Sequence, residues 1–239
     1  MVEPTPTFAE RINGLLLATL WCDAAMAEDL CLLSECLAET GGGDADALRQ
    51  AGMGVAPPGG AAGILMRSLV YGVFTPMQRS RLRRGVYRCI GLSSHDELAA
   101  IAATAAAVIA ADLCRGFEIE DCLVRCRQTL LEEAPTALLE ALRSLPAGAE
   151  FQPPTDVLGT LQLGATTLGR AHGVQRCAEL LATSGEARAF GAALSAIRDG
   201  VADLEISSLK SSPLYQRVRK AADAFAAAAM PPELSAAAG

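Results

Sequence analysis

Apolar residues recur along most of this chain at the spacing of an amphipathic helix. Near the N-terminus, the apolar positions of 8–25 and of 26–39 repeat every three or four residues. Stretches rich in glycine or proline interrupt the pattern at 41–44, 52–63 and 146–154. Alternating β-branched runs, which strands favour, are scarce. The pattern therefore predicts an all-α protein, folded as a compact, irregular orthogonal bundle of about ten helices.

Several residues mark where individual helices should begin or end. Ser94 and Glu97 have the spacing of a capping box, which predicts a helix start, and Gly116 should close that helix. Ser212 followed by Pro213 is typical of a helix start, since serine caps well and proline suits the first helical position. The other segments with helical spacing are 64 onward, 118–131, 135–145, 155–169, 173–183 and 187–204.

Length, composition and charge narrow the class of protein. With 239 residues, 51% of them hydrophobic, the chain can form one large core, so we predict a single domain over 1–230 and a flexible tail over 231–239. A net charge of −7 provides no attraction to nucleic acid or anionic membranes. The apolar run 98–113 is shorter than the roughly 20 residues that span a bilayer, which predicts a buried core helix. Residues 1–10 lack the parts of a secretory signal, so we expect a cytoplasmic protein.

Eight cysteines fall mostly within apolar helical patterns, and none forms a Cys-x-x-Cys pair. We therefore expect reduced, buried thiols that act as small hydrophobic residues rather than zinc ligands or a redox pair. The chain has two histidines, His95 and His172, and no local motif supports a cysteine–histidine nucleophile.

The stretch 11–24 resembles the first helix of the ADP-ribosylglycohydrolase family, which reads Arg-x-x-Gly-x-Leu-x-Gly-x-Ala-x-Gly-Asp-Ala. The positions that match this pattern are Arg11, Gly14, Leu16, Asp23 and Ala24. Ala18 and Cys22 stand where the family has glycine.

Three later stretches resemble further motifs of this family, in the family's order. Residues 62–67 resemble Asn-Gly-Ala-x-Met-Arg, with Ala62 in place of the asparagine. Residues 94–96 resemble a Thr-His pair followed by an acidic turn, and 184–197 resemble Gly-Gly-Asp-Ala-Asp-Thr followed by a helix of small residues. The resemblance thus covers nearly the whole chain and implies an ADP-ribosylglycohydrolase-like fold.

The resemblance also implies where a metal centre would lie. Family members use a Thr-Asp-Asp-Thr box and an Asp-Ala-Asp-Thr box to hold two divalent cations, which position the ribose and activate water to release ADP-ribose from an acceptor. Here the first box becomes 27–30 with Glu28 and Asp29, and the second becomes 186–189 with Glu186 and Arg188. Three hydroxyls and one carboxylate are missing, and the segment that precedes the first box is short.

Arg188 is the most informative departure, because a guanidinium at a ligand position repels a cation. We predict that Arg188 forms a bidentate salt bridge with Glu28, Asp29 or Glu186, which would then be vestigial catalytic and metal-binding residues. By the same resemblance, the ligand-binding positions are Asp23, Met66, Arg67, His95 and Asp96.

Structural interpretations remain open for several of these residues. Glu28 and Asp29 could be solvent-facing acids of a first helical turn, His95 could pack beside its helix cap, and Met66 could fill the core. The basic run 79–84 is most simply a solvated turn, with an acidic partner surface as the alternative. The glycine-rich 52–63 loop lacks the Gly-Lys-Ser/Thr ending of a phosphate-binding loop.

Three functions are consistent with the sequence. The favoured one is a catalytically inactive binding or regulatory relative, whose partner would be ADP-ribose or an ADP-ribosylated protein and which needs no cofactor. The second is an active hydrolase with reduced metal dependence, using Glu28 or Asp29 as general base, and only here would Mg²⁺ or Mn²⁺ be expected. The third is a structural or assembly protein whose cleft is filled.

Overall fold

The computed structural model describes residues 5–145 and 152–229, and these form helices without any strand. The prediction of an all-α fold is therefore confirmed. In chain order the helices are α1 (Phe8–Cys22), α2 (Ala24–Thr40), α3 (Ala45–Gln50), α4 (Gly60–Phe74), α5 (Arg79–Ser93), α6 (Glu97–Cys114), α7 (Ile119–Leu130), α8 (Thr136–Ala141), α9 (Val157–Arg170), α10 (Val174–Leu180), α11 (Ala187–Asp199), α12 (Ile206–Leu209) and α13 (Tyr215–Ala228). The predicted tail, 231–239, and most of the break at 146–154 lie outside the described residues.

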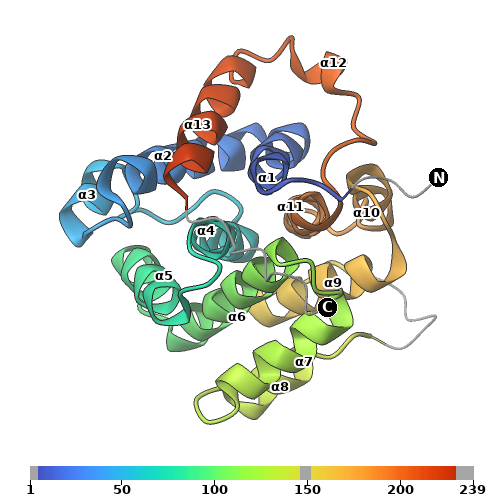
Figure 1. The fold of residues 1–239 in the computed structure, drawn as a ribbon. Helices are drawn as coiled ribbons and strands as arrows, with labels where there is room; N and C mark the ends of the chain where they lie inside the picture. Colours follow the sequence, from blue (N-terminus) through green and yellow to red (C-terminus); the bar gives the residue numbers. More distant parts are fainter. Residues whose placement is uncertain (1–4, 146–151, 230–239) are drawn as a thin grey trace, which may run out of the picture.

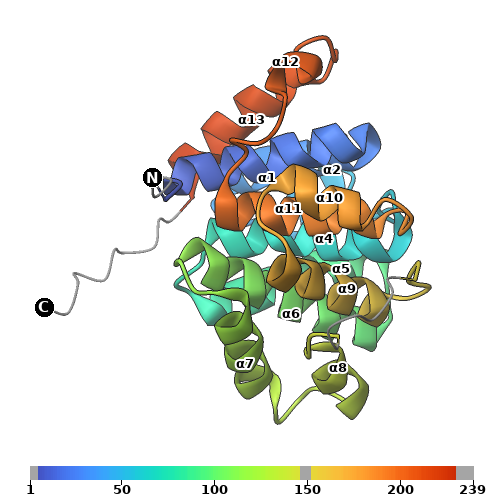
Figure 2. The ribbon, with the colours of Figure 1, turned by 90° about the vertical axis from the view of Figure 1, so that its right-hand side faces the viewer.

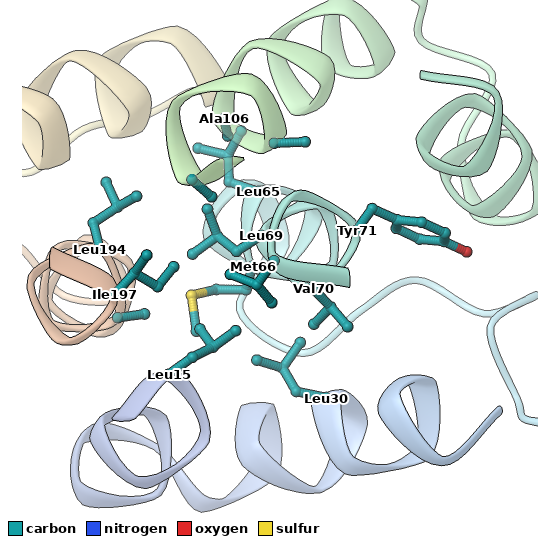
Figure 3. Close-up of a cluster of buried hydrophobic side chains, with 14 of the residues drawn as sticks. Leu15, Leu30, Leu65, Met66, Leu69, Val70, Tyr71, Ala106, Leu194 and Ile197 are labelled. Carbon is teal, nitrogen blue, oxygen red and sulfur yellow. The ribbon is translucent and has the colours of Figure 1, made fainter. Parts of the chain in front are cut away.

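The helices stack in layers around α4 (Figures 1 and 2). α1, α2 and α13 lie on one side of α4, α5 and α6 lie on the other, and α11 packs beside it. Figure 3 shows Leu65 and Leu69 of α4 among side chains from these neighbours, including Leu15, Leu30 and Leu194. This position brings the start of α4 close to the starts of α2 and α11.

α6 is the predicted core helix, and 89% of it is buried. It is long and apolar enough to cross a membrane, but its side chains pack against the surrounding helices. Small residues bring α4 and α6 close together: a Cβ atom on Gly72 would lie 2.4 Å from the carbonyl oxygen of Ala107 and 2.8 Å from the Cβ of Ala110. The alanine-rich composition thus allows close contact between helix backbones.

Several of the predicted helix boundaries are wrong. The helix predicted over 187–204 ends at Asp199, and the helix expected to start at Ser212 and Pro213 begins at Tyr215. α1 ends at Cys22, because Asp23 leaves the helical conformation and caps α2, its Oδ1 accepting a hydrogen bond from the Met26 amide at 3.0 Å. The predicted capping box at Ser94 is displaced by two residues. Asp96 is the actual cap of α6, accepting from the Leu98 amide at 2.9 Å, because Ser94 already ends α5.

The basic run 79–84 is the first part of α5, and the interpretation as a solvated turn is wrong. Its arginines connect α5 to distant segments. Arg79 pairs with Asp112, Arg81 donates to the carbonyl of Gly41, and Arg83 pairs with Glu133. The run therefore contributes to tertiary structure, which a local charge pattern does not reveal.

All eight cysteines are free, and seven of them are buried. The prediction of reduced, buried thiols agrees with this arrangement. Burial raises the pKa of the partly exposed Cys22 to about 11, and that of Cys31 to about 12. Because the thiolate is the reactive form, these thiols are poor nucleophiles at neutral pH.

We therefore expect the native protein to react slowly with Ellman's reagent at pH 7, with Cys22 as the first thiol to be modified. In denaturant all eight thiols should react within the mixing time. Absorbance followed over time, in native buffer and in denaturant, measures the two reaction rates. A Cys22→Ser variant should lose the fastest native phase, and rapid labelling of several native thiols would contradict the buried arrangement.

Candidate functional site

The starts of α2, α4 and α11 meet at one place, where the resemblance puts a ligand site. A Cβ atom on Gly59 would lie 1.8 Å from Met26 Cε and 3.6 Å from the carboxyl carbon of Glu186. A Cβ atom on Gly60 would lie 3.8 Å from Glu186 Oε2. The two glycines thus let Met26 and Glu186 approach the start of α4, which has no side-chain cap. A carboxylate is favourable at this position because the helix dipole is positive there.

Asp29 points from α2 toward α4 and forms a bidentate ion pair with Arg67. Its Oδ2 and Oδ1 accept hydrogen bonds from Nε and Nη2 of Arg67 at 2.8 and 2.7 Å. The Arg67 side chain is 0% exposed and also donates to the carbonyls of Met53 and Val55. Arg67 therefore joins α2, α4 and the connector before α4, and the prediction that it contacts a ligand does not agree with its burial.

Glu28 points in a different direction from Asp29, because adjacent residues of a helix are about 100° apart. It pairs with Arg217 of α13, whose Nη1 lies 3.2 Å from Glu28 Oε1, and Arg217 also pairs with Glu35 at 3.1 Å. The Glu28 side chain is 52% exposed. The sequence had suggested that Glu28 and Asp29 converge with Glu186, and this prediction does not hold.

This donor set does not fit a dinuclear metal site. Both oxygens of Asp29 accept from Arg67, Glu28 is held by α13, and Glu186 lies against the start of α4. Within 5–145 and 152–229, no three His, Cys, Asp or Glu side chains gather as metal ligands would. Hard cations need several free oxygen ligands at one point, which these three acids do not provide.

Arg188 does not form the predicted salt bridge. Among the described residues no ion pair joins it to an acid; its guanidinium lies over the ring of Trp21, 5.0 Å from the centroid. Its Nε is buried and has no hydrogen-bond partner. The reason for the error is that arginines of α4 and α13 already occupy Asp29 and Glu28. Arg188 thus places a positive charge in the first turn of α11 that forms no ion pair with a described carboxylate.

The remaining predicted site residues have structural surroundings. Asp23 caps α2, Met66 lies in the core among leucines (Figure 3), and Asp96 caps α6. His95 is exposed beside that cap. The end of α5 nevertheless adjoins the Arg67–Asp29 pair, because Ser93 Oγ lies 3.5 Å from Arg67 Nη1.

Sequence reasoning missed three contributors to this region: Trp21, Met26 and Gly59. One signal pointed to part of the arrangement. Arg67 interrupts a run of apolar helical residues, and a buried charge needs a partner. No local signal in the sequence identified Asp29 as the partner of Arg67.

A separate cavity of about 590 Å³ lies at the other end of α1 and α11, lined in part by Arg11, His172 and Asp199. Arg11 donates to the carbonyls of Leu113 and Ile197, in the last turns of α6 and α11, at 3.1 and 2.5 Å. Burial lowers the pKa of Arg11. This arginine, which matches the family pattern, therefore stabilises two helix ends.

Comparison with known proteins identifies the fold. No protein-family model matches the chain, and no curated protein sequence matches it. Among solved structures, the chain is similar to an "ADP-ribosylglycohydrolase-related protein complex", with a TM-score of 0.73 and 17% sequence identity. The match covers 94% of this chain and 99% of that chain. The chain thus has the ADP-ribosylglycohydrolase-like fold that the sequence predicted.

Proposed function

We propose that this protein uses an ADP-ribosylglycohydrolase-like fold as a binding or regulatory module that has lost dimetal catalysis. The observation that carries the proposal is the Arg67–Asp29 pair, in which a completely buried guanidinium occupies both oxygens of the carboxylate. A cation would have to displace this pair and leave Arg67 buried without its partner, which is costly.

The ligand we propose is ADP-ribose, free or attached to a protein, bound in the cytoplasm without a divalent metal. The starts of α4 and α11 have no side-chain caps, so their amide groups and dipoles favour an anion, and the exposed Glu186 side chain that now lies against the start of α4 would have to turn away to admit one. The unpaired Arg188 adds positive charge at the same place. A diphosphate suits this environment better than a metal ion does.

The competing function is an active hydrolase that uses one acid as general base. Asp29 is unsuited to this role because its oxygens accept from Arg67, which leaves Glu28. The proposed function therefore predicts that ADP-ribosyl-arginine is not hydrolysed above the blank rate, with or without Mg²⁺ or Mn²⁺. Product analysis by chromatography, with an active glycohydrolase as positive control, tests this.

Calorimetric titration with ADP-ribose should give the same affinity with and without Mg²⁺. Arg188→Gln should weaken binding at least tenfold, because it removes the charge beside the helix starts. Arg219→Gln, at an exposed position of α13, is the matched control and should leave binding unchanged. Turnover together with metal-enhanced binding would establish the hydrolase instead, and no binding at all would favour a structural role.

A further inference from the structure

Three arginines surround one buried carboxylate where α5, α6 and α7 meet. The Asp112 side chain, in the last turn of α6, is 0% exposed. It pairs with Arg79 at the start of α5, with Arg115 Nη1 at 3.1 Å and with Arg125 Nε at 3.4 Å. One carboxylate offsets one guanidinium, so this group carries an excess of two positive charges.

Phe117 holds two of these arginines in place. The guanidinium carbons of Arg115 and Arg125 lie 4.9 and 4.3 Å from the centroid of its ring. Stacking on an aromatic ring together with a shared carboxylate fixes both guanidinium groups despite their mutual repulsion. We call Arg115, Phe117 and Arg125 the arginine cluster.

The arginine cluster retains hydrogen-bond donors that face solvent. Arg115 uses only Nη1 and Arg125 only Nε in hydrogen bonds with described residues, and their side chains are 26% and 42% exposed. None of the acids at the start of α7, Glu118, Glu120 and Asp121, forms an ion pair with them within the described part of the chain. Donors of this kind, fixed before binding, match the oxygens of an oxyanion.

We propose that the arginine cluster binds a phosphate monoester group. Such a group carries a charge of about −1.5 to −2 at pH 7, which matches the two uncompensated guanidinium groups. The cluster is distinct from the proposed ADP-ribose site. It lies by the end of α6, against which the end of α4 packs at Gly72, whereas the proposed ADP-ribose site lies at the start of α4, and a 15-residue helix is about 22 Å long. α7, which supplies Arg125, packs against α6 at the edge of the bundle (Figure 2).

The test is a titration of the whole protein with inorganic phosphate and with a phosphoserine peptide, using chloride at equal ionic strength as the blank. We expect the Nε–Hε signals of Arg115 and Arg125 in ¹H–¹⁵N spectra to shift with both phosphate compounds and not with chloride. Tighter binding of the peptide would indicate a phosphoprotein source, and equal binding a free phosphate compound. Shifts that chloride reproduces, or none, would overturn the proposal.

Variants provide a second readout. The double substitution Arg115→Gln and Arg125→Gln should weaken phosphate binding at least tenfold. The control variant, Arg83→Gln with Arg84→Gln, removes the same charge from the neighbouring α5 and should preserve phosphate binding. If both double variants lose the same phosphate affinity, the effect is one of general electrostatics and the proposal is contradicted. If the first variant fails to fold, judged by circular dichroism, the arginine signals of the unmodified protein decide the outcome.

Discussion

Replacement of Arg67 by methionine is expected to lower the free energy of unfolding by about 3–5 kcal/mol, because it leaves a largely buried carboxylate without a partner. Asp29 would lose both hydrogen bonds, and the carbonyls of Met53 and Val55 would lose their donor. Urea denaturation followed by circular dichroism measures the change. The connector before α4 should also become more sensitive to proteolysis, since Arg67 fixes it.

Two comparisons test whether the lost ion pair causes this effect. Adding Asp29→Leu to Arg67→Met should recover much of the lost stability, because replacing both partners of a buried pair by apolar residues is often neutral. Arg49→Met breaks the exposed Arg49–Asp46 pair and should leave the transition unchanged. If Arg67→Met unfolds at the same urea concentration as the unmodified protein, Asp29 is not held as described and would be available to a ligand.

Replacement of Gly72 by alanine should destabilise the protein by about 1–3 kcal/mol or more, because overpacking forces the backbone to shift. The new Cβ would meet the Ala107 carbonyl at 2.4 Å and the Ala110 Cβ at 2.8 Å, and neither can move without separating α4 from α6. Thermal and urea unfolding measure the loss. α4 also carries the start that adjoins Glu186, so displacement of this helix should weaken binding of ADP-ribose as well.

Gly91→Ala is the matched control, since Gly91 is an exposed helical glycine whose Cβ would have no neighbour within 4 Å. There alanine should stabilise α5 by about 0.5–1 kcal/mol through its helix propensity. Equal effects of the two substitutions would show that propensity rather than close packing governs both positions.

Some elements of the fold could be predicted because their signals are local. Helical spacing of apolar residues identified most helices, and glycine or proline breaks separated them. The short α3 and α12 were missed because they are only 6 and 4 residues long. α5 was missed because its basic start was interpreted as a turn, although Leu82, Val86, Cys89 and Ile90 recur at helical spacing. The boundary at Ser94 was misplaced because one serine could end α5 or cap α6, and only the extent of α5 decides between them.

The candidate site was less predictable, because it depends on which helix faces meet. The sequence placed Glu28 and Asp29 next to each other on a helix, but their partners Arg217 and Arg67 are 189 and 38 residues away. Arg188 was assigned to these acids from its place in a motif. The structure instead puts it over Trp21, since the directions of α4 and α13 bring other arginines to the acids first.

The sequence by itself determined the helical class, the breaks between most helices, the buried thiols and the resemblance that named the fold, because each depends on neighbouring residues or on short motifs. Only the tertiary structure decided how the charges pair. It joined Asp29 to Arg67, turned Glu28 toward α13, and gathered three arginines around Asp112. Pairing of buried charges depends on the packing of distant helices, and that information is not local to any segment of the chain.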